Sequence, residues 1–229
     1  MNSKSVLITG AKGGLGTHVT ETFLRAGAVV AGVSRSIKQA DFPHPNFTAF
    51  SAELTDGASA AKVADAVRAK FGKIDVLIHL TGGFAGGKSV AETDDQTFEQ
   101  MLDINLRSAF YILRSVIPHM RNAGSGRIVA IGSRAADGPA PGIGAYAAFK
   151  TALVSLVRTV ASENKDLGIT ANVILPGTMD TPANRTSEPK ADFSRWIQPQ
   201  HVADLILWLS SEAAGQISGA VIPVYGRDV

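Results

Sequence analysis

The sequence contains no cysteine among its 229 residues, which excludes disulfide bonds, thiolate catalysis and cysteine-ligated metal sites. Charged residues are few, at 18%, and the net charge is only +2, without a run of like charge. A nucleic acid or an acidic membrane surface is therefore not expected as a partner. The five histidines show no spacing typical of metal ligands, so no metal is expected either.

Long hydrophobic segments are also missing. The longest apolar stretches fall far short of the roughly 20 residues that cross a bilayer. The first residues, Met1–Lys4, lead directly into a strand-like run without a signal peptide. These absences favour a cytoplasmic location.

The sequence is rich in apolar residues, at 45%, arranged as short β-branched runs that alternate with longer helix-like segments. The runs are almost continuously apolar, which is typical of strands covered on both faces. This pattern predicts an α/β fold: a single Rossmann-type doubly wound parallel sheet of about seven strands with helices on both faces. Strands are expected near residues 4–9, 28–33, 47–51, 74–80, 126–132, 169–175 and 220–224. Helices are expected near residues 14–26, 57–70, 95–121, 144–165 and 199–210.

Two segments interrupt this alternation. Residues 36–46 contain Pro43 and Pro45, which favour a loop or a stunted helix. Residues 176–199 are polar and punctuated by proline, and longer than most connections in a compact domain. Such a loop is often a mobile lid or binding loop, so we expect a lid-like substrate loop at about 181–198.

A glycine-rich turn joins the first strand to the first helix, in the run Thr9-Gly10-Ala11-Lys12-Gly13-Gly14-Leu15-Gly16. Glycine there allows positive φ and a close approach of a pyrophosphate, while the helix N-terminus offers free N–H groups. No composition shift marks a second domain, so residues 1–229 are predicted to form one dinucleotide-binding domain. The phosphate-binding residues are expected to be Gly10, Lys12, Gly13, Gly14, Leu15 and Gly16.

The spacing Thr-Gly-x-x-x-Gly-x-Gly resembles that of the short-chain dehydrogenase/reductase family. Four further matches follow in the family's order: Asn105 within a helix, Ser133 at a strand end, the pair Tyr146 and Lys150, and the run Pro176-Gly177-Thr178-Met179-Asp180-Thr181. The resemblance covers essentially the whole chain. It implies an oxidoreductase in which Lys150 holds the nicotinamide ribose. It further implies that Asn105 orders a water molecule that relays protons to Lys150. The remaining contacts that it implies on the nicotinamide side are Gly82, Tyr146, Pro176, Gly177 and Thr181.

The residues themselves indicate the chemistry. Tyr146 and Lys150 are four apart on a predicted helix and so share one face. An ammonium near a phenol stabilises phenolate and lowers the phenol's pKa, which suits Tyr146 to act as general acid in carbonyl reduction and base in alcohol oxidation. Ser133 is expected to hydrogen-bond the substrate oxygen.

The end of the second strand bears on the choice of coenzyme. An acid at this point binds the ribose hydroxyls of NAD, but here Ser34 is followed by Arg35 and Ser36. Arg35, with Lys12 as a second cation, suits a 2′-phosphate, so NADP(H) is favoured over NAD(H). Glu53 and Leu54 are expected beside the adenine.

The pocket for a small-molecule substrate is expected to be lined by Phe84, Ile143 and Trp196, whereas Trp208 is expected in the core. Apolar and aromatic walls favour a planar or cyclic carbonyl. Residues 82–87, 180–185 and 191–196 are similar to quinonoid dihydropteridine reductase, so a dihydropterin or quinone is an alternative substrate. A cofactor-binding sensor on the same fold is the non-enzyme alternative. The resemblance also implies a homodimer or homotetramer built on the helices at 95–121 and 144–165.

Overall fold

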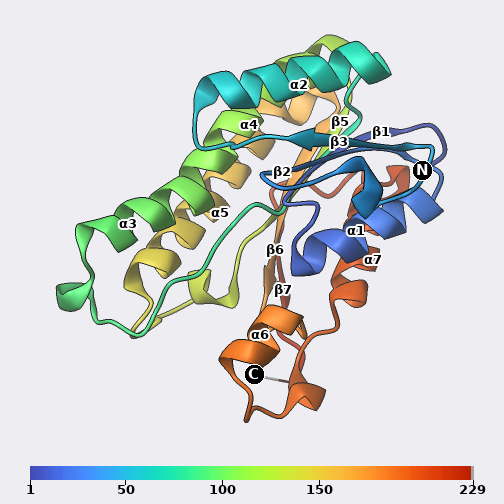
Figure 1. Cartoon of the computed structure of the whole chain (residues 1–229). Helices are drawn as coiled ribbons and strands as arrows, with labels where there is room; N and C mark the ends of the chain where they lie inside the picture. The colour runs from blue at the N-terminus through green and yellow to red at the C-terminus, as the bar shows by residue number, and fades with distance from the viewer. Residues whose placement is uncertain (228–229) are drawn as a thin grey trace.

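The apolar runs form one parallel sheet in the computed structural model, which describes residues 1–227 (Figure 1). Its seven strands lie in the order β3-β2-β1-β4-β5-β6-β7. Each predicted strand is present with ends shifted by at most two residues. The bounds are β1 Ser5–Thr9, β2 Val29–Ser34, β3 Phe47–Ser51, β4 Val76–His79, β5 Gly126–Ile131, β6 Ile169–Pro176 and β7 Val221–Val224.

The strand order reverses direction between β1 and β4. From β1 the chain builds outwards to β2 and β3, and it then returns to place β4 on the other side of β1. Thr9 is paired with His79 in the parallel register, so the loops after β1 and β4 leave the same edge of the sheet in opposite directions. A doubly wound sheet binds its ligand in the crevice at such a point.

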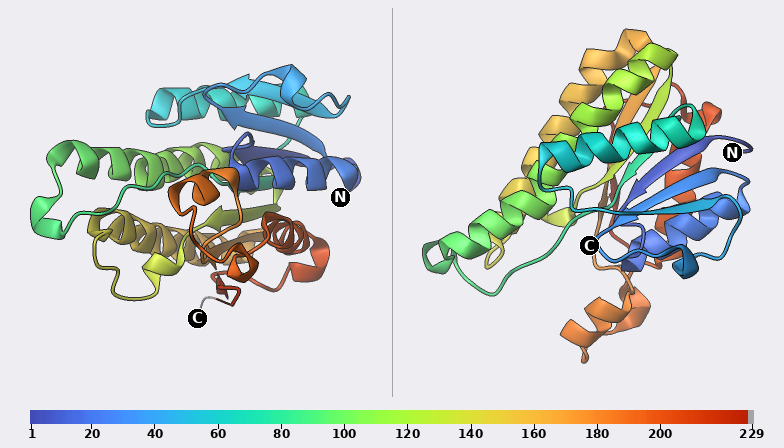
Figure 2. Two further views of the ribbon diagram at one scale, coloured as in Figure 1. Left: turned by 60° about the horizontal axis from the view of Figure 1, so that its bottom comes forward. Right: turned by 45° about the horizontal axis from the view of Figure 1, so that its top comes forward.

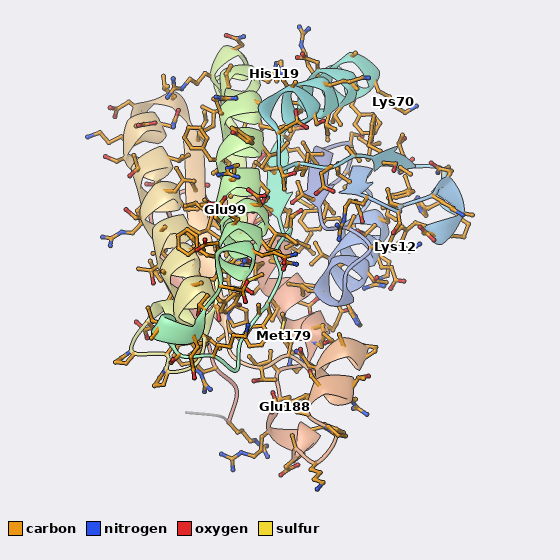
Figure 3. The ribbon with its side chains drawn as sticks, turned by 60° about the vertical axis from the view of Figure 1, so that its left-hand side comes forward. Lys12, Lys70, Glu99, His119, Met179 and Glu188 are labelled. Carbon is orange, nitrogen blue, oxygen red and sulfur yellow. The ribbon has the colours of Figure 1, made fainter. Side chains whose placement is uncertain are left out.

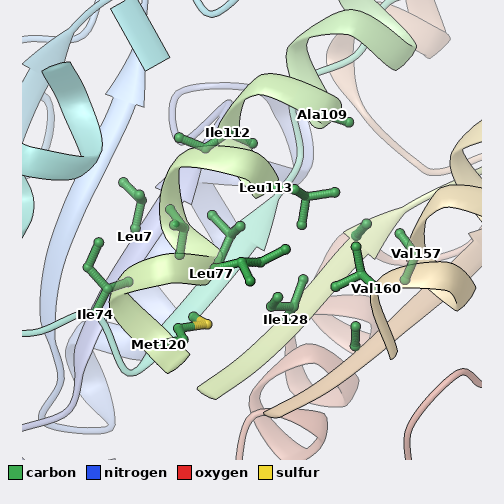
Figure 4. Packing of buried hydrophobic residues seen from close by; sticks show 14 of the residues in the cluster. Leu7, Ile74, Leu77, Ala109, Ile112, Leu113, Met120, Ile128, Val157 and Val160 are labelled. Carbon is green, nitrogen blue, oxygen red and sulfur yellow. The ribbon is translucent and has the colours of Figure 1, made fainter. Parts of the chain in front are cut away.

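Helices cover both faces of the sheet (Figures 1 and 2). On one face, buried residues of α2, α4 and α5 pack against the strands, as Figure 4 shows for part of this cluster. On the other face, α1 and α7 pack together over the sheet. The helix bounds are α1 Gly14–Arg25, α2 Gly57–Phe71, α3 Asp95–Leu102, α4 Ser108–Ala123, α5 Gly144–Asn164, α6 Pro182–Ser187 and α7 Pro199–Leu209. None of the helices in residues 1–227 has the length and apolar character needed to span a membrane.

The structure divides the helix that was predicted over 95–121. A π-helical turn, Asp103–Arg107, joins α3 to α4. The stunted helix expected within 36–46 is the single 3₁₀ turn η1, Gln39–Asp41.

The segment predicted as a loop at 181–198 contains the short helix α6. Thr181 caps this helix by accepting a hydrogen bond from Asn184 N, and Pro182 occupies its first turn. Proline is well suited to this position because the first N–H of a helix has no intrahelical partner. The segment projects from the body of the sheet (Figure 2).

Trp208 was expected in the core, and this expectation is wrong. Its side chain is 47% exposed. The buried face of α7 is formed by Val202, Ala203, Ile206 and Leu209 at helical spacing, and Trp208 falls outside that stripe.

Candidate active site

A cavity of about 1250 Å³ opens at the carboxyl edge of the sheet. It is bordered by the glycine turn after β1, the loops after β4, β5 and β6, the first turns of α5, and α6. The predicted site residues that line it are Gly10, Lys12, Gly13, Gly14, Leu15, Gly16, Gly82, Phe84, Ser133, Ile143, Tyr146, Lys150, Pro176, Gly177 and Thr181. Those that lie outside its lining are Ser34, Arg35, Ser36, Glu53, Leu54, Asn105 and Trp196.

The glycine turn leaves no room for side chains on its inner side. Gly10 has a φ of +68°, and a Cβ there would come within 2.9 Å of the Leu80 carbonyl carbon. A Cβ on Gly16 would overlap the Gly10 carbonyl oxygen. Helix α1 follows with Gly13 as its N-cap and without a side-chain cap, so its first N–H groups are free to face the cavity. This cradle fits the pyrophosphate of a dinucleotide, whose negative charge is favoured at a helix N-terminus.

A hydroxyl at the end of β1 connects the two loops that flank the cavity. Thr9 Oγ1 accepts hydrogen bonds from Leu80 N at 3.2 Å and from Thr81 N at 3.3 Å. The same oxygen lies 2.9 Å from His79 Nδ1. Since both lone pairs of the hydroxyl are used, its proton is directed to the imidazole. His79 is buried, and burial lowers the pKa of this imidazole to about 3, with a smaller effect from Lys150, so His79 is a neutral structural residue.

Ser133 and Tyr146 meet at the cavity wall. Ser133 follows β5 and its Oγ accepts a hydrogen bond from Ala135 N at 3.2 Å. Tyr146 lies in the first turn of α5 and lines the same cavity as Ser133. Burial raises the pKa of the Tyr146 phenol, and the Ser133 side chain partly offsets this. The lowering expected from Lys150 is not among the effects on this phenol.

Lys150 lies one turn further along α5 and is only 5% exposed. Its Nζ donates a hydrogen bond to Ile131 O at 3.0 Å and lies 5.8 Å from the centroid of the Tyr146 ring. Burial lowers the pKa of the Lys150 ammonium to about 8. The amine is thus held beside the phenol by a backbone carbonyl rather than by a carboxylate.

Asn105 is buried in the π-helical turn and holds the loop after β4. Its Oδ1 accepts a hydrogen bond from Gly83 N at 3.1 Å, and its Nδ2 donates to Gly83 O at 3.0 Å and to Met101 O at 3.1 Å. A Cβ at Gly82 would lie 3.1 Å from both Asn105 Oδ1 and Lys150 Nζ. The π-turn, a feature frequent at functional sites, therefore brings Asn105 close to the amine.

The residues expected around the adenosine lie at the far end of β2. Arg35 is largely exposed, and its Nε is 3.8 Å from Glu53 Oε2. Lys12 Nζ donates hydrogen bonds to Asp41 Oδ1 at 2.9 Å and to Ser36 O at 3.4 Å. The Leu54 side chain is buried in the core with α2 and α4, so only its backbone is left to meet a ligand.

Two of the three residues expected around a substrate, Phe84 and Ile143, line the cavity. Phe84 is 68% exposed and meets Tyr146 edge to face, with ring centroids 5.1 Å apart. Trp196, in contrast, is 8% exposed and packs on Phe193 with centroids 4.7 Å apart. The expectation that Trp196 forms a wall is not met, because the indole is buried within the projecting segment.

Several cavity residues were not found from the sequence. Arg134 adjoins Ser133, which is a signal that could have pointed to it, whereas nothing in the sequence distinguishes Asp137. Asp137 Oδ2 accepts a hydrogen bond from the Tyr225 hydroxyl at 2.7 Å. Figure 3 labels three lining residues: Lys12 at the glycine turn, and Met179 and Glu188 in the segment below it. Arg134, Asp137 and Glu188 therefore add charged groups to a cavity whose expected walls are apolar.

The projecting segment has its own internal brace. The Asp180 carboxylate accepts hydrogen bonds from Arg185 Nε at 2.5 Å and Nη2 at 2.8 Å, and from Gln198 Nε2 at 3.0 Å. These bonds, the arginine's first, lower the pKa of Asp180 to about 2. A Cβ on Gly14 would lie 2.8 Å from Thr181 Cγ2, so this braced segment begins directly against the phosphate cradle.

Replacement of Lys150 by methionine should stabilise the protein at neutral pH. The folded-state pKa of about 8 lies below the usual 10.5, so between these values the unfolded chain retains a proton that the folded chain has released. Stability of the wild type must therefore rise with pH across this window. We expect Lys150→Met to exceed the wild type by up to about 3 kcal/mol at pH 7, and this advantage to shrink towards pH 10.

The measurement is the free energy of unfolding in denaturant at a series of pH values. The exposed Lys62 of α2 provides the control, because Lys62→Met removes an amine that is solvated in both states. An advantage of Lys150→Met that is absent or independent of pH would contradict the buried-ammonium interpretation.

The chain matches the short chain dehydrogenase family over residues 4–192. It is 34% identical to a short-chain dehydrogenase/reductase, cdmF, of Talaromyces verruculosus, over 96% of this chain and 94% of that protein. It is 29% identical to the 3-oxoacyl-(acyl-carrier-protein) reductase FabG of Escherichia coli, over 97% and 96% of the two chains.

Two similar solved structures contain a nicotinamide coenzyme. ElxO with NADP bound shares 26% identity and a TM-score of 0.92, covering 99% of this chain and 98% of that one. A 3-ketoacyl-(acyl-carrier-protein) reductase from Brucella melitensis complexed with NADH shares 26% identity and a TM-score of 0.89, covering 100% and 99%. The chain belongs to the short-chain dehydrogenase/reductase family of NAD(P)-dependent oxidoreductases.

Proposed function

We propose that the protein uses NADP(H) to interconvert a carbonyl and an alcohol, with Tyr146 as the general acid and base. The observation that carries this proposal is that Ser133, Tyr146 and Lys150 line one cavity with the glycine turn, the Lys150 amine lying 5.8 Å from the centroid of the Tyr146 ring. When bound, the coenzyme supplies or accepts the hydride.

Each residue has a distinct part in the reduction. Ser133 donates a hydrogen bond to the substrate oxygen and stabilises the charge that develops there. Tyr146 gives its phenolic proton to that oxygen. The ammonium of Lys150 then stabilises the phenolate, whose formation burial opposes. In the oxidation direction the same groups act in reverse.

Asn105 supports the return of the proton. Both hydrogens of its amide are used on backbone carbonyls, and Oδ1 accepts one backbone hydrogen bond. An amide oxygen has a second lone pair, which is available to a water near Lys150. Asn105 therefore both fixes the loop after β4 and provides an anchor for a proton relay.

The preference for NADP(H) rests on the end of β2. Ser34 stands where NAD-binding relatives of this fold carry an acid, and the next residue, Arg35, has a side chain that is 72% exposed. A guanidinium with free donors suits a phosphate dianion. Among similar structures, one carries NADP and another NADH, so the fold accommodates both coenzymes and the local charge must decide.

The substrate is proposed to be a planar or cyclic carbonyl. Phe84 presents an exposed ring to the cavity directly beside Tyr146, and an aromatic face favours a flat molecule. The alternative is a quinone or a quinonoid dihydropterin, which the same ring would also accept. A screen of NADPH oxidation with ketones, acyl thioesters, quinones and quinonoid dihydropterin distinguishes these classes.

Tyr146→Phe should lower turnover on any carbonyl found in that screen by at least about 100-fold, because the variant lacks the proton donor. Coenzyme affinity and thermal stability should stay near the wild-type values, since only one oxygen is removed. Tyr111→Phe on α4 is the matched control and should keep full activity. Turnover of Tyr146→Phe at the wild-type rate would exclude the proposed mechanism.

The double variant Ser34→Asp/Arg35→Ala should shift coenzyme preference from NADPH towards NADH. It introduces an acid for the ribose hydroxyls and removes the cation for the 2′-phosphate. The measurement is the ratio of kcat/KM for the two coenzymes. A wild type that already prefers NADH by about tenfold, equivalent to about 1.4 kcal/mol, would contradict the role given to Arg35.

We also propose a homodimer or homotetramer that is built on α3, α4 and α5. These helices expose Phe98 and Phe110, with Arg114 stacked over the Phe110 ring. Phe110→Glu should reduce the mass in solution by placing a charge in an apolar contact, while Val90→Glu in an exposed turn should not. Light scattering after size exclusion measures the mass. A wild-type chain with the mass of one copy would refute this assembly.

A further inference from the structure

The Lys12 ammonium is already paired with a carboxylate. Lys12 Nζ lies 2.9 Å from each oxygen of Asp41. The side chains are 41% and 23% exposed, respectively, so the pair lies partly shielded from solvent. Asp41 is 29 residues away in the chain, and no sequence pattern connects it with the glycine turn.

Asp41 is held in this position by its own local structure. Its Oδ2 accepts a hydrogen bond from Lys38 N at 2.8 Å, which closes the 3₁₀ turn η1. Gln39 fixes this turn to β3 by donating to Phe47 O at 2.9 Å and accepting from Ala49 N at 3.2 Å. The carboxylate is therefore positioned by an anchored turn rather than by a flexible loop.

Lys12 connects the phosphate cradle with the end of β2. The residue belongs to the glycine turn and lines the cavity. Its ammonium also donates a hydrogen bond to Ser36 O, two residues after the end of β2. In a doubly wound sheet the adenine ribose lies at this strand end. The Lys12–Asp41 pair is therefore expected beside the 2′ position of the adenine ribose, which carries a phosphate in NADP(H) and a hydroxyl in NAD(H).

Arg35, the second cation at the end of β2, has a weaker ion pair than Lys12. Arg35 Nε is 3.8 Å from Glu53 Oε2, and both side chains are more than half exposed. An exposed pair of this kind contributes little, so Arg35 can turn towards a phosphate. Lys12 cannot turn towards a phosphate without losing its ion pair with Asp41. The Asp41 carboxylate repels a phosphate dianion whether or not this ion pair is kept.

We propose that Asp41 is a coenzyme-specificity residue that weakens the discrimination in favour of NADP(H). It occupies the Lys12 ammonium and adds negative charge beside the 2′-phosphate, so that recognition of this phosphate depends on Arg35. The proposal rests on binding of a nicotinamide dinucleotide in the cavity, and it holds whichever coenzyme the wild type prefers.

The test is the ratio of the dissociation constants for NADH and NADPH, measured by titration calorimetry at low ionic strength. Asp41→Asn keeps an acceptor for Lys38 N but removes the charge, and should shift this ratio about fivefold towards NADPH. The shift should shrink in high salt, because exposed charges are screened. Glu163→Gln makes the same change of charge near the end of α5, at the opposite edge of the sheet, and should leave the ratio unchanged.

A double-mutant cycle with Lys12 separates this role from a structural one. In the wild-type background Lys12→Gln leaves the Asp41 carboxylate without its partner and should shift the ratio towards NADH. In the Asp41→Asn background the same replacement should remove most of the fivefold gain. Asp41→Ser provides a second neutral variant if Asp41→Asn is poorly folded.

A ratio that stays unchanged or falls in both neutral variants would overturn the proposal, since Asp41 would then be orienting Lys12 towards the phosphate. A ratio that Asp41→Asn fails to shift towards NADPH in the Lys12→Gln background, where the carboxylate has no partner, would overturn it as well. A wild type that prefers NADH would instead contradict the proposed use of NADP(H), and the shift between variants would still be measurable.

Discussion

The Thr9 hydroxyl, at the point where β1 and β4 diverge, is the contact on which the site depends. It binds the backbone of the loop after β4, while Gly10 in the next position brings the glycine turn within van der Waals contact of Leu80. These contacts hold the glycine turn and the wall that carries Ser133 and Tyr146 around one cavity. The cavity therefore lies between two loops that leave the sheet in opposite directions and are joined at their bases.

Much of this arrangement could be predicted because it is encoded locally. Continuous apolar runs identify strands of a parallel sheet, and Ser133, Tyr146 and Lys150 are placed by their positions at a strand end and along one helix. The burial of the Trp196 and Trp208 side chains could not be predicted in this way. Whether an indole faces a cavity, the core or solvent depends on which neighbours pack against it, and these come from distant parts of the chain.

Electrostatic pairing shows the same limit. The sequence identified Lys12 and Arg35 as cations near the ribose, but it could not indicate that Asp41 holds one of them. The sequence also predicted that Lys150 lowers the pKa of the Tyr146 phenol. In the structure, burial raises the pKa of that phenol and lowers the pKa of the Lys150 amine to about 8. Burial thus disfavours the charged form of each group, the phenolate of Tyr146 and the ammonium of Lys150.

The brace formed by Asp180, Arg185 and Gln198 has a consequence for the thermodynamics of ligand binding. Because the carboxylate stays ionised down to a pH of about 2, the brace persists across the physiological range and keeps the projecting segment in one arrangement. A segment that is ordered beforehand loses little conformational entropy when a ligand binds. A ligand that contacts such a segment therefore binds at a smaller entropic cost than one around which a loop must first fold.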